Sequence, residues 1–247
     1  MTPGDFLFSS EIVRYLDLFG VFLTGIVGGA YGRRLRFDAV GFASVAIISA
    51  LGGGILRDLI LAYGTPAAFA GPWYLCFALA GATFAFLVKT EGRKWRVGIG
   101  VMDAAVIGTW AAVGVAKSLN YGLSVLPAIM LGVVYAVGGG AIRDIAVGKI
   151  PEIFGGGPLY ATAALLTSVL TAGCILLPVP GETVFLAIAA GAATAILAKW
   201  LRWRLPQHDD WSVTLSAAQL KSLVRRVRRS EQKRVEAELQ EAIDEIS

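Results

Sequence analysis

The feature that constrains this chain most is a seven-residue motif that occurs twice within apolar sequence. Residues 52–58 read GGGILRD and residues 138–144 read GGGAIRD, an offset of 86 positions (138 − 52). A second marker keeps this offset, because Leu16-Asp17 returns as Met102-Asp103. One offset shared by two markers indicates an internal duplication.

The composition is that of an integral membrane protein. The 247 residues are 56% hydrophobic and only 16% charged, whereas soluble domains carry about 25% charged residues. The net charge of +4 comes largely from a basic tail and two loops, so it does not indicate nucleic-acid binding.

Seven apolar segments are long enough to be drawn as transmembrane helices. The expected fold is an all-α polytopic membrane protein with seven transmembrane helices. The segments are Ile12–Gly32, Ala39–Ala62, Trp73–Lys89, Val97–Ala116, Leu123–Gly148, Pro158–Leu177 and Glu182–Trp200.

Each copy of the duplication holds three of these segments, so the second copy must enter the membrane from the opposite side. Such repeats are inverted and are related by a pseudo-two-fold axis in the membrane plane. The expected organisation is a three-helix repeat over 12–89, an inverted three-helix repeat over 97–177, a seventh transmembrane helix over 182–200 and a charged helical tail over 212–247.

Loop charges predict the orientation. Lys and Arg follow the first, third and seventh segments, while the loops after the second and sixth carry none. By the positive-inside rule the N-terminus lies outside and the C-terminal tail in the cytoplasm.

The glycine triplets predict broken helices. Three successive glycines are poor helix formers, and a break inside a membrane must face protein or a water-filled cavity. We therefore expect helices two and five to be broken, near the bilayer centre and facing each other, at two triplets: Gly52, Gly53 and Gly54, and Gly138, Gly139 and Gly140.

The charged residues predict one polar cluster in each repeat. Arg57, Asp58 and Asp17 share one depth, and Arg143, Asp144 and Asp103 share another. Adjacent helical residues do not face each other, so we expect Arg57 to pair with Asp17 and Arg143 with Asp103. Two arginines against four aspartates weakly favour cations. The alternative is that these charges have a purely structural role and hold neighbouring helices together.

A Gly and a Pro follow each motif, in the order Gly64, Pro66 and Gly148, Pro151. Pro66 comes eight residues after Asp58, whereas Pro151 comes seven after Asp144. A glycine followed by a proline is a helix stop.

With these features the chain resembles the trimeric intracellular cation channel family, in particular its prokaryotic branch. The resemblance covers about Ile12–Trp200. It implies a homotrimer in the cell membrane of a prokaryote, with one pore in each subunit kinked at the glycine triplets. It also implies voltage-dependent conduction of monovalent cations, mainly potassium.

The family's motif is carried over to the pore and gate here as Gly52–Gly54, Gly138–Gly140, Arg57, Asp58, Arg143 and Asp144, with Asp17 and Asp103 as supporting charges. We expect permeant K⁺ and bound lipid as ligands, with no cofactor and no metal site. Expected partners are further copies of the chain and membrane lipids, anionic ones included.

Two other functions fit parts of this sequence. Inverted repeats with mid-membrane breaks also describe secondary transporters, so a carrier of a small amino acid such as glycine is the alternative. GGxxRD also resembles a nucleotidyltransferase signature, but that chemistry needs an Asp-x-Asp metal site and none occurs. The chain is therefore not expected to be an enzyme.

Overall fold

The computed structural model describes residues 11–62, 64–88, 92–154, 159–201 and 203. The chain divides into two compact units, Met1–Leu205 and Pro206–Ser247, and all described residues belong to the first. The expected tail helix over 212–247 lies outside the described residues. The helices are α2 (Glu11–Arg34), α3 (Ala39–Leu61), α4 (Ala67–Ala70), α5 (Pro72–Leu87), α6 (Arg93–Asn120), α7 (Val125–Ala146), α8 (Tyr160–Leu176) and α9 (Thr183–Trp200).

These helices agree closely with the expected segments, since each long helix begins and ends within four residues of its prediction. Five of them, α2, α3, α6, α7 and α9, are long and apolar enough to cross a membrane. The other two apolar helices are shorter, 16 residues in α5 and 17 in α8. At about 1.5 Å per residue they reach less than a hydrocarbon core of about 30 Å, so seven full crossings stay a prediction.

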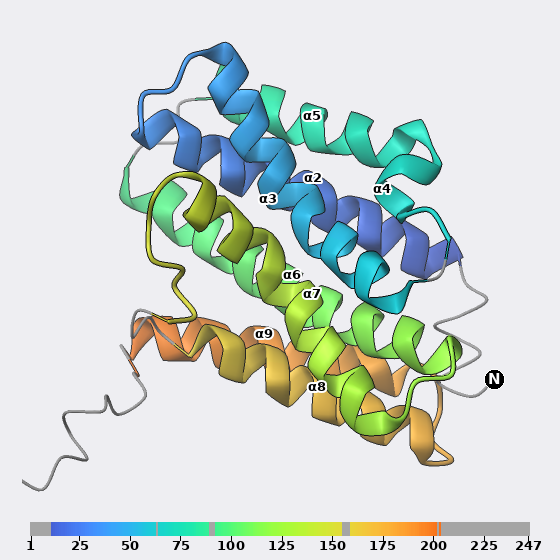
Figure 1. The fold of residues 1–247 in the computed structure, drawn as a ribbon. Helices are drawn as coiled ribbons and strands as arrows, with labels where there is room; N and C mark the ends of the chain where they lie inside the picture. The colour runs from blue at the N-terminus through green and yellow to red at the C-terminus, as the bar shows by residue number, and fades with distance from the viewer. Residues whose placement is uncertain (1–10, 63, 89–91, 155–158, 202, 204–247) are drawn as a thin grey trace, which may run out of the picture. The chain divides into compact units, whose positions relative to one another are not determined.

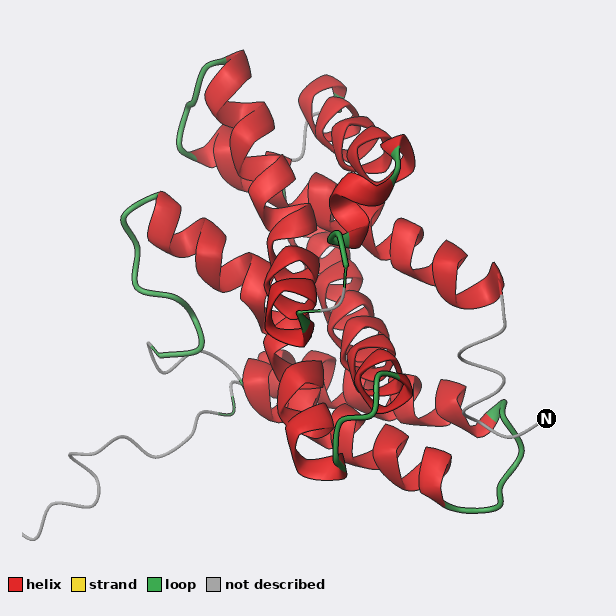
Figure 2. Ribbon diagram, turned by 45° about the vertical axis from the view of Figure 1, so that its right-hand side comes forward, coloured by secondary structure: helices red, strands yellow, loops and turns green. Residues whose placement is uncertain are grey.

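Two pairs of helices form the centre of the bundle. In Figure 1, α2 and α3 lie beside α6 and α7, with α4 and α5 on one side and α8 and α9 on the other. The two halves meet where α3 contacts α7 and α2 contacts α6. Figure 2, which shows the bundle from a second direction, draws every described element as a helix or a loop.

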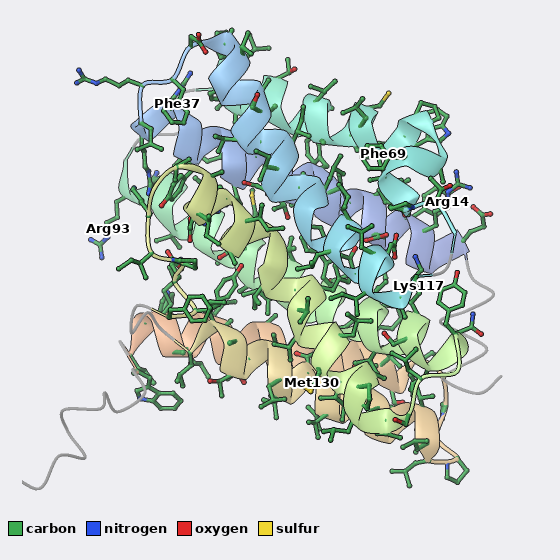
Figure 3. All side chains as sticks on the ribbon, viewed as in Figure 1. Arg14, Phe37, Phe69, Arg93, Lys117 and Met130 are labelled. Carbon is green, nitrogen blue, oxygen red and sulfur yellow. The ribbon has the colours of Figure 1, made fainter. Side chains whose placement is uncertain are left out.

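Corresponding helices of the two halves run in opposite directions. Arg14, near the start of α2, and Arg93, at the start of α6, lie at opposite ends of the bundle in Figure 3. The colour gradient of Figure 1 shows the same reversal for α3 and α7. This is the relationship that inverted repeats require.

The glycine triplets do not break their helices, so the expectation of broken helices was wrong. Both α3 and α7 remain helical through them. The glycines instead let the two backbones touch, because a Cβ at Gly53 would overlap the carbonyl oxygen of Tyr135 and one at Gly139 would overlap that of Ser49. A Cβ at Gly138 would lie 3.3 Å from the Cα of Gly53. The triplets do face each other as expected, but as a close helix crossing built from small residues.

Both helices end just before their Gly-Pro signal, α3 at Leu61 with a left-handed Ala62 as its cap and α7 at Ala146. Gly64 and Gly148 have φ angles of 74° and 72°, a left-handed conformation that glycine adopts without a steric penalty. The backbone N–H after each proline then turns back toward the motif's aspartate. Ala67 N donates to Asp58 Oδ2 at 2.8 Å and Glu152 N to Asp144 Oδ2 at 3.4 Å, so the connecting turn absorbs the one-residue difference in proline spacing.

The helix crossing predicts opposite effects at two neighbouring glycines of α7. Gly139→Ala should lower the free energy of unfolding by about 1–3 kcal/mol, because its Cβ meets the Ser49 backbone. Gly140→Ala is the matched control. Its Cβ would lie 3.8 Å from Arg143 Nη2, so the better helix former should be neutral or stabilising by up to about 1 kcal/mol. Thermal unfolding in one detergent measures both, and equal midpoints would contradict the crossing.

Candidate functional site

The first polar cluster is built around Asp58 in the last turn of α3. Its Oδ1 accepts hydrogen bonds from Arg57 Nε at 2.8 Å and from Lys117 Nζ of α6 at 2.7 Å. Arg57 is only 1% exposed. One carboxylate thus compensates two cations, and Figure 3 shows Lys117 at the same end of the bundle as Arg14.

Asp17 of α2 completes the first cluster, but its partners are tyrosines. Tyr74 of α5 donates to Asp17 Oδ2 at 2.8 Å, and the hydroxyl of Tyr135 of α7 donates to Asp17 Oδ1. The Tyr135 ring also covers the guanidinium of Arg57, whose Cζ lies 4.1 Å from the ring centroid, and stacks on Trp110 at a centroid distance of 5.1 Å. We call Asp17, Arg57, Asp58, Tyr74, Lys117 and Tyr135 the first cluster.

The second cluster repeats this pattern at the other end of the central helices. Arg143 donates to Asp144 Oδ1 from Nε at 2.9 Å and from Nη2 at 2.8 Å. Tyr160 of α8 donates to Asp103 Oδ1 of α6 at 3.1 Å. The ring of Tyr31 covers Arg143 at 4.4 Å and Lys149 at 4.7 Å. We call Tyr31, Asp103, Arg143, Asp144, Lys149 and Tyr160 the second cluster.

The expected pairs Arg57–Asp17 and Arg143–Asp103 were wrong. Each arginine pairs with the aspartate that follows it in the chain. The physical reason is that tyrosine hydroxyls already occupy Asp17 and Asp103. A long arginine side chain can fold back to the carboxylate of the next residue. The spacing rule for helices, by which residues three or four apart face each other, does not cover this contact.

The sequence reasoning missed the tyrosines, although a signal for two of them was present. Tyr74 and Tyr160 are 86 residues apart (160 − 74), and each lies 57 residues from the aspartate that it contacts. The offset that revealed the duplication would therefore have identified this pair. Lys117 and Tyr135 have no such partner, because their counterparts at the same offset are Tyr31 and Ser49.

A cavity of about 220 Å³ opens beside the second cluster. It reaches the glycine crossing at Gly140, and its charged lining carries both signs. The basic side chains are Arg34, Arg143 and Lys199, and the acidic ones are Asp103, Asp144 and Glu152.

The balance of charge decides what this cavity can hold. Water occupies about 30 Å³ per molecule, so the cavity has room for a hydrated small cation or for one small zwitterion. Three basic and three acidic side chains leave no net charge in the lining. Lys117 likewise adds a positive charge to the first cluster. The excess of negative charge expected from four aspartates and two arginines is therefore neutralised. Among the described residues, no group of three metal-ligating side chains comes together.

Relatives of known name cover most of the chain. The family model described as "Glycine transporter" matches residues 14–90 and again 100–175. A UPF0126 membrane protein of Deinococcus radiodurans is 33% identical over 202 residues, which are 80% of this chain and 92% of the relative. The UPF0126 inner membrane protein YadS of Escherichia coli strain K12 is 30% identical over 200 residues, 78% of this chain and 94% of the relative.

Solved structures share the fold, and those named here are cation channels. One, described with the words "Structural basis for conductance through TRIC cation channels", has a TM-score of 0.72 and 25% identity over 82% of this chain and 98% of its own. The trimeric intracellular cation channel orthologue from Rhodobacter sphaeroides has a TM-score of 0.69 and 29% identity over 78% of this chain and 97% of its own. A C. elegans channel with bound Ca²⁺, 14% identical with a TM-score of 0.58, shows the fold alone. The predicted resemblance is thereby confirmed, as is the expectation that the chain is not an enzyme.

The first cluster makes a prediction about Asp58. Asp58→Asn should lower stability by about 3–5 kcal/mol, because it removes the carboxylate that contacts both Arg57 and Lys117. Lys117→Gln should cost about 1 kcal/mol or less, because this partly exposed lysine leaves the Arg57–Asp58 pair intact. Thermal unfolding of the single variants and of the double variant measures both effects. Costs that simply add would contradict shared compensation, since coupled sites are non-additive.

Proposed function

Since this chain belongs to the family whose model is described as "Glycine transporter" and shares its fold with cation channels, we propose that it conducts cations through the membrane. The observation that carries the proposal is the charged cavity at the second cluster, which reaches Gly140, the last glycine of the α7 triplet. Polar groups buried in a membrane protein are costly and mark pathways for ions or substrates.

The proposed pathway runs along α3 and α7 within one subunit. It enters at the cavity beside Asp103 and Arg143, passes the close approach of the two glycine triplets and leaves at the first cluster beside Asp17 and Arg57. Carboxylates lie at both of its ends, and tyrosine hydroxyls donate hydrogen bonds to them there. These oxygens are suited to replace the hydration shell of a monovalent cation.

Several finer properties belong to the same proposal. We propose potassium as the physiological ion, a homotrimer with one pathway in each subunit, and gating by voltage at the glycine triplets. We also propose a location in the inner membrane of a prokaryote, with the N-terminus outside and the tail in the cytoplasm. The relatives support two of these points, the inner membrane and the trimer, because YadS is an inner membrane protein and the Rhodobacter structure is a trimeric channel. Lipids, including anionic ones, are proposed to surround the basic helix ends.

A carrier for a small amino acid is the second candidate, and two observations favour it. The family model that matches both repeats is described as a glycine transporter. The cavity lining is also balanced between acidic and basic side chains, as the recognition of a zwitterion requires. In this alternative Arg143 binds the substrate carboxylate, and Asp103 lies within the same cavity to face its ammonium group.

Planar-bilayer recording of the purified protein under a potassium gradient separates the two candidates. Discrete current steps that reverse near the potassium equilibrium potential establish a channel. Saturable uptake of glycine into liposomes without unitary currents establishes a carrier and makes the arginines substrate ligands.

Two cations that share one aromatic ring provide a matched test of the pathway. Arg143 is 8% exposed and lines the cavity, whereas Lys149 is exposed, and both lie over the Tyr31 ring. Arg143→Ala should change unitary conductance or open probability by about twofold or more, because a charge in a low-dielectric pathway alters the local ion concentration severalfold. Lys149→Ala should have a smaller effect. Equal, negligible changes in single-channel recordings would exclude a pore role for Arg143.

A further inference from the structure

The contacts of the two halves correspond at the offset of 86 residues. Gly28 of α2 packs against Ser49 of α3, where a Cβ on the glycine would lie 2.7 Å from the serine Oγ. Gly114 of α6 packs in the same way against Tyr135 of α7, at 3.2 Å from the tyrosine Cβ. Ser49 and Tyr135 thus occupy equivalent positions in the two halves (49 + 86 = 135).

The two side chains at this position differ greatly in size and reach. Tyr135 extends from α7 into the other half, where its hydroxyl donates to Asp17 and its ring covers Arg57. A Cβ at Gly54 would lie 3.6 Å from the edge of that ring. Ser49 instead turns back to its own helix and donates to the carbonyl of Val45 at 2.8 Å.

A second pair of equivalent positions shows the same asymmetry. Trp110 of α6 stacks on Tyr135 and is 1% exposed. Its counterpart at the same offset is Thr24 of α2, whose hydroxyl donates to the carbonyl of Gly20 at 2.8 Å. Two stacked aromatic rings in one half therefore correspond to two small hydroxyl side chains in the other.

The cavity reaches those groups of the second half that correspond to the groups contacted by Tyr135 in the first. Its lining includes Asp103, Gly140 and Arg143, which are the counterparts of Asp17, Gly54 and Arg57. In the first cluster the Tyr135 ring lies against these counterparts. Tyr135 thus contacts all three groups in the first cluster. At the second cluster the Tyr31 ring covers Arg143, and the cavity still reaches Asp103, Gly140 and Arg143.

We propose that Tyr135, backed by Trp110, closes the pathway at the first cluster. Ser49, at the equivalent position of the other half, bonds to its own helix and provides no such closure at the second. This inference rests on the proposed function, because it identifies the side chain that controls one end of the same pathway. The ring itself provides the closure: it fills the space and shields Arg57, while the hydroxyl holds the ring against Asp17.

Cysteine accessibility tests the closure without requiring transport. Gly54→Cys and Gly140→Cys form a matched pair, because the nearest atom to a Cβ at either glycine lies 3.6 Å or 3.8 Å away and neither is overlapped. The native cysteines, Cys76 and Cys174, are first replaced by alanine. The full-length protein in lipid nanodiscs is then treated with a small, positively charged methanethiosulfonate, and the rate of modification is followed by mass spectrometry.

The cysteine at 140 should react about tenfold faster than the cysteine at 54, because thiol modification requires access. Adding Tyr135→Ser to Gly54→Cys should bring its rate up to that of Gly140→Cys. Tyr135→Phe keeps the ring and should leave the rate low. Tyr15→Ser, at a tyrosine that is 63% exposed on α2, is the control for loss of a tyrosine elsewhere and should also have no effect.

Two results would overturn the inference. The first is equal modification of the two cysteines while Tyr135 is present. The second is an unchanged low rate at position 54 when Tyr135 is replaced. Tyr135→Leu serves as the second variant if Tyr135→Ser does not fold, since it removes the ring and keeps an apolar side chain. If the labelling behaves as expected but no variant passes current or glycine, the closure stands and the proposed function fails.

Discussion

The backbones of α3 and α7 touch at Gly53 and Gly139, and this contact sets the distance between the two halves of the bundle. Hydrophobic side chains gain little from leaving lipid for a helix interface, so close backbone packing between small residues has to hold such helices together. The crossing brings each half's charged motif within reach of side chains from the other half. Lys117 then reaches Asp58, Tyr135 reaches Asp17, and Tyr31 reaches Arg143.

Buried charge is the second constraint, and the bundle meets it at the ends of α3 and α7. Asp58 and Asp144 each neutralise the arginine before them and accept a backbone N–H from the following turn. An aromatic ring covers one face of each guanidinium group, at 4.1 Å and 4.4 Å, a favourable contact when water is excluded. The charged motif is thus stable within an apolar bundle because every strong charge has a partner at short range.

This arrangement bears on the choice between a channel and a carrier. Lys117 and Lys199 bring the polar clusters close to neutrality, so selectivity for cations has to come from local geometry rather than from net charge. Neutral lining with both signs also suits a zwitterion. Tyr135 and Trp110 cover the first cluster, and a cavity reaches the second. A pathway with one covered end is compatible with a closed channel and with one state of an alternating-access carrier.

The sequence by itself determined the helices and their duplication. Hydropathy located each long helix to within four residues, because a helix that spans a bilayer needs a long continuous apolar stretch. The shared offset identified the glycines, arginines and aspartates that the structure gathers, and the Gly-Pro signals placed the ends of α3 and α7. Only the tertiary structure decided that the glycines form a crossing rather than a break, that each arginine pairs with its neighbouring aspartate, and that Tyr135 rather than Arg57 bonds to Asp17. These outcomes depend on which side chains and backbones packing brings into contact, and local sequence patterns do not encode that packing.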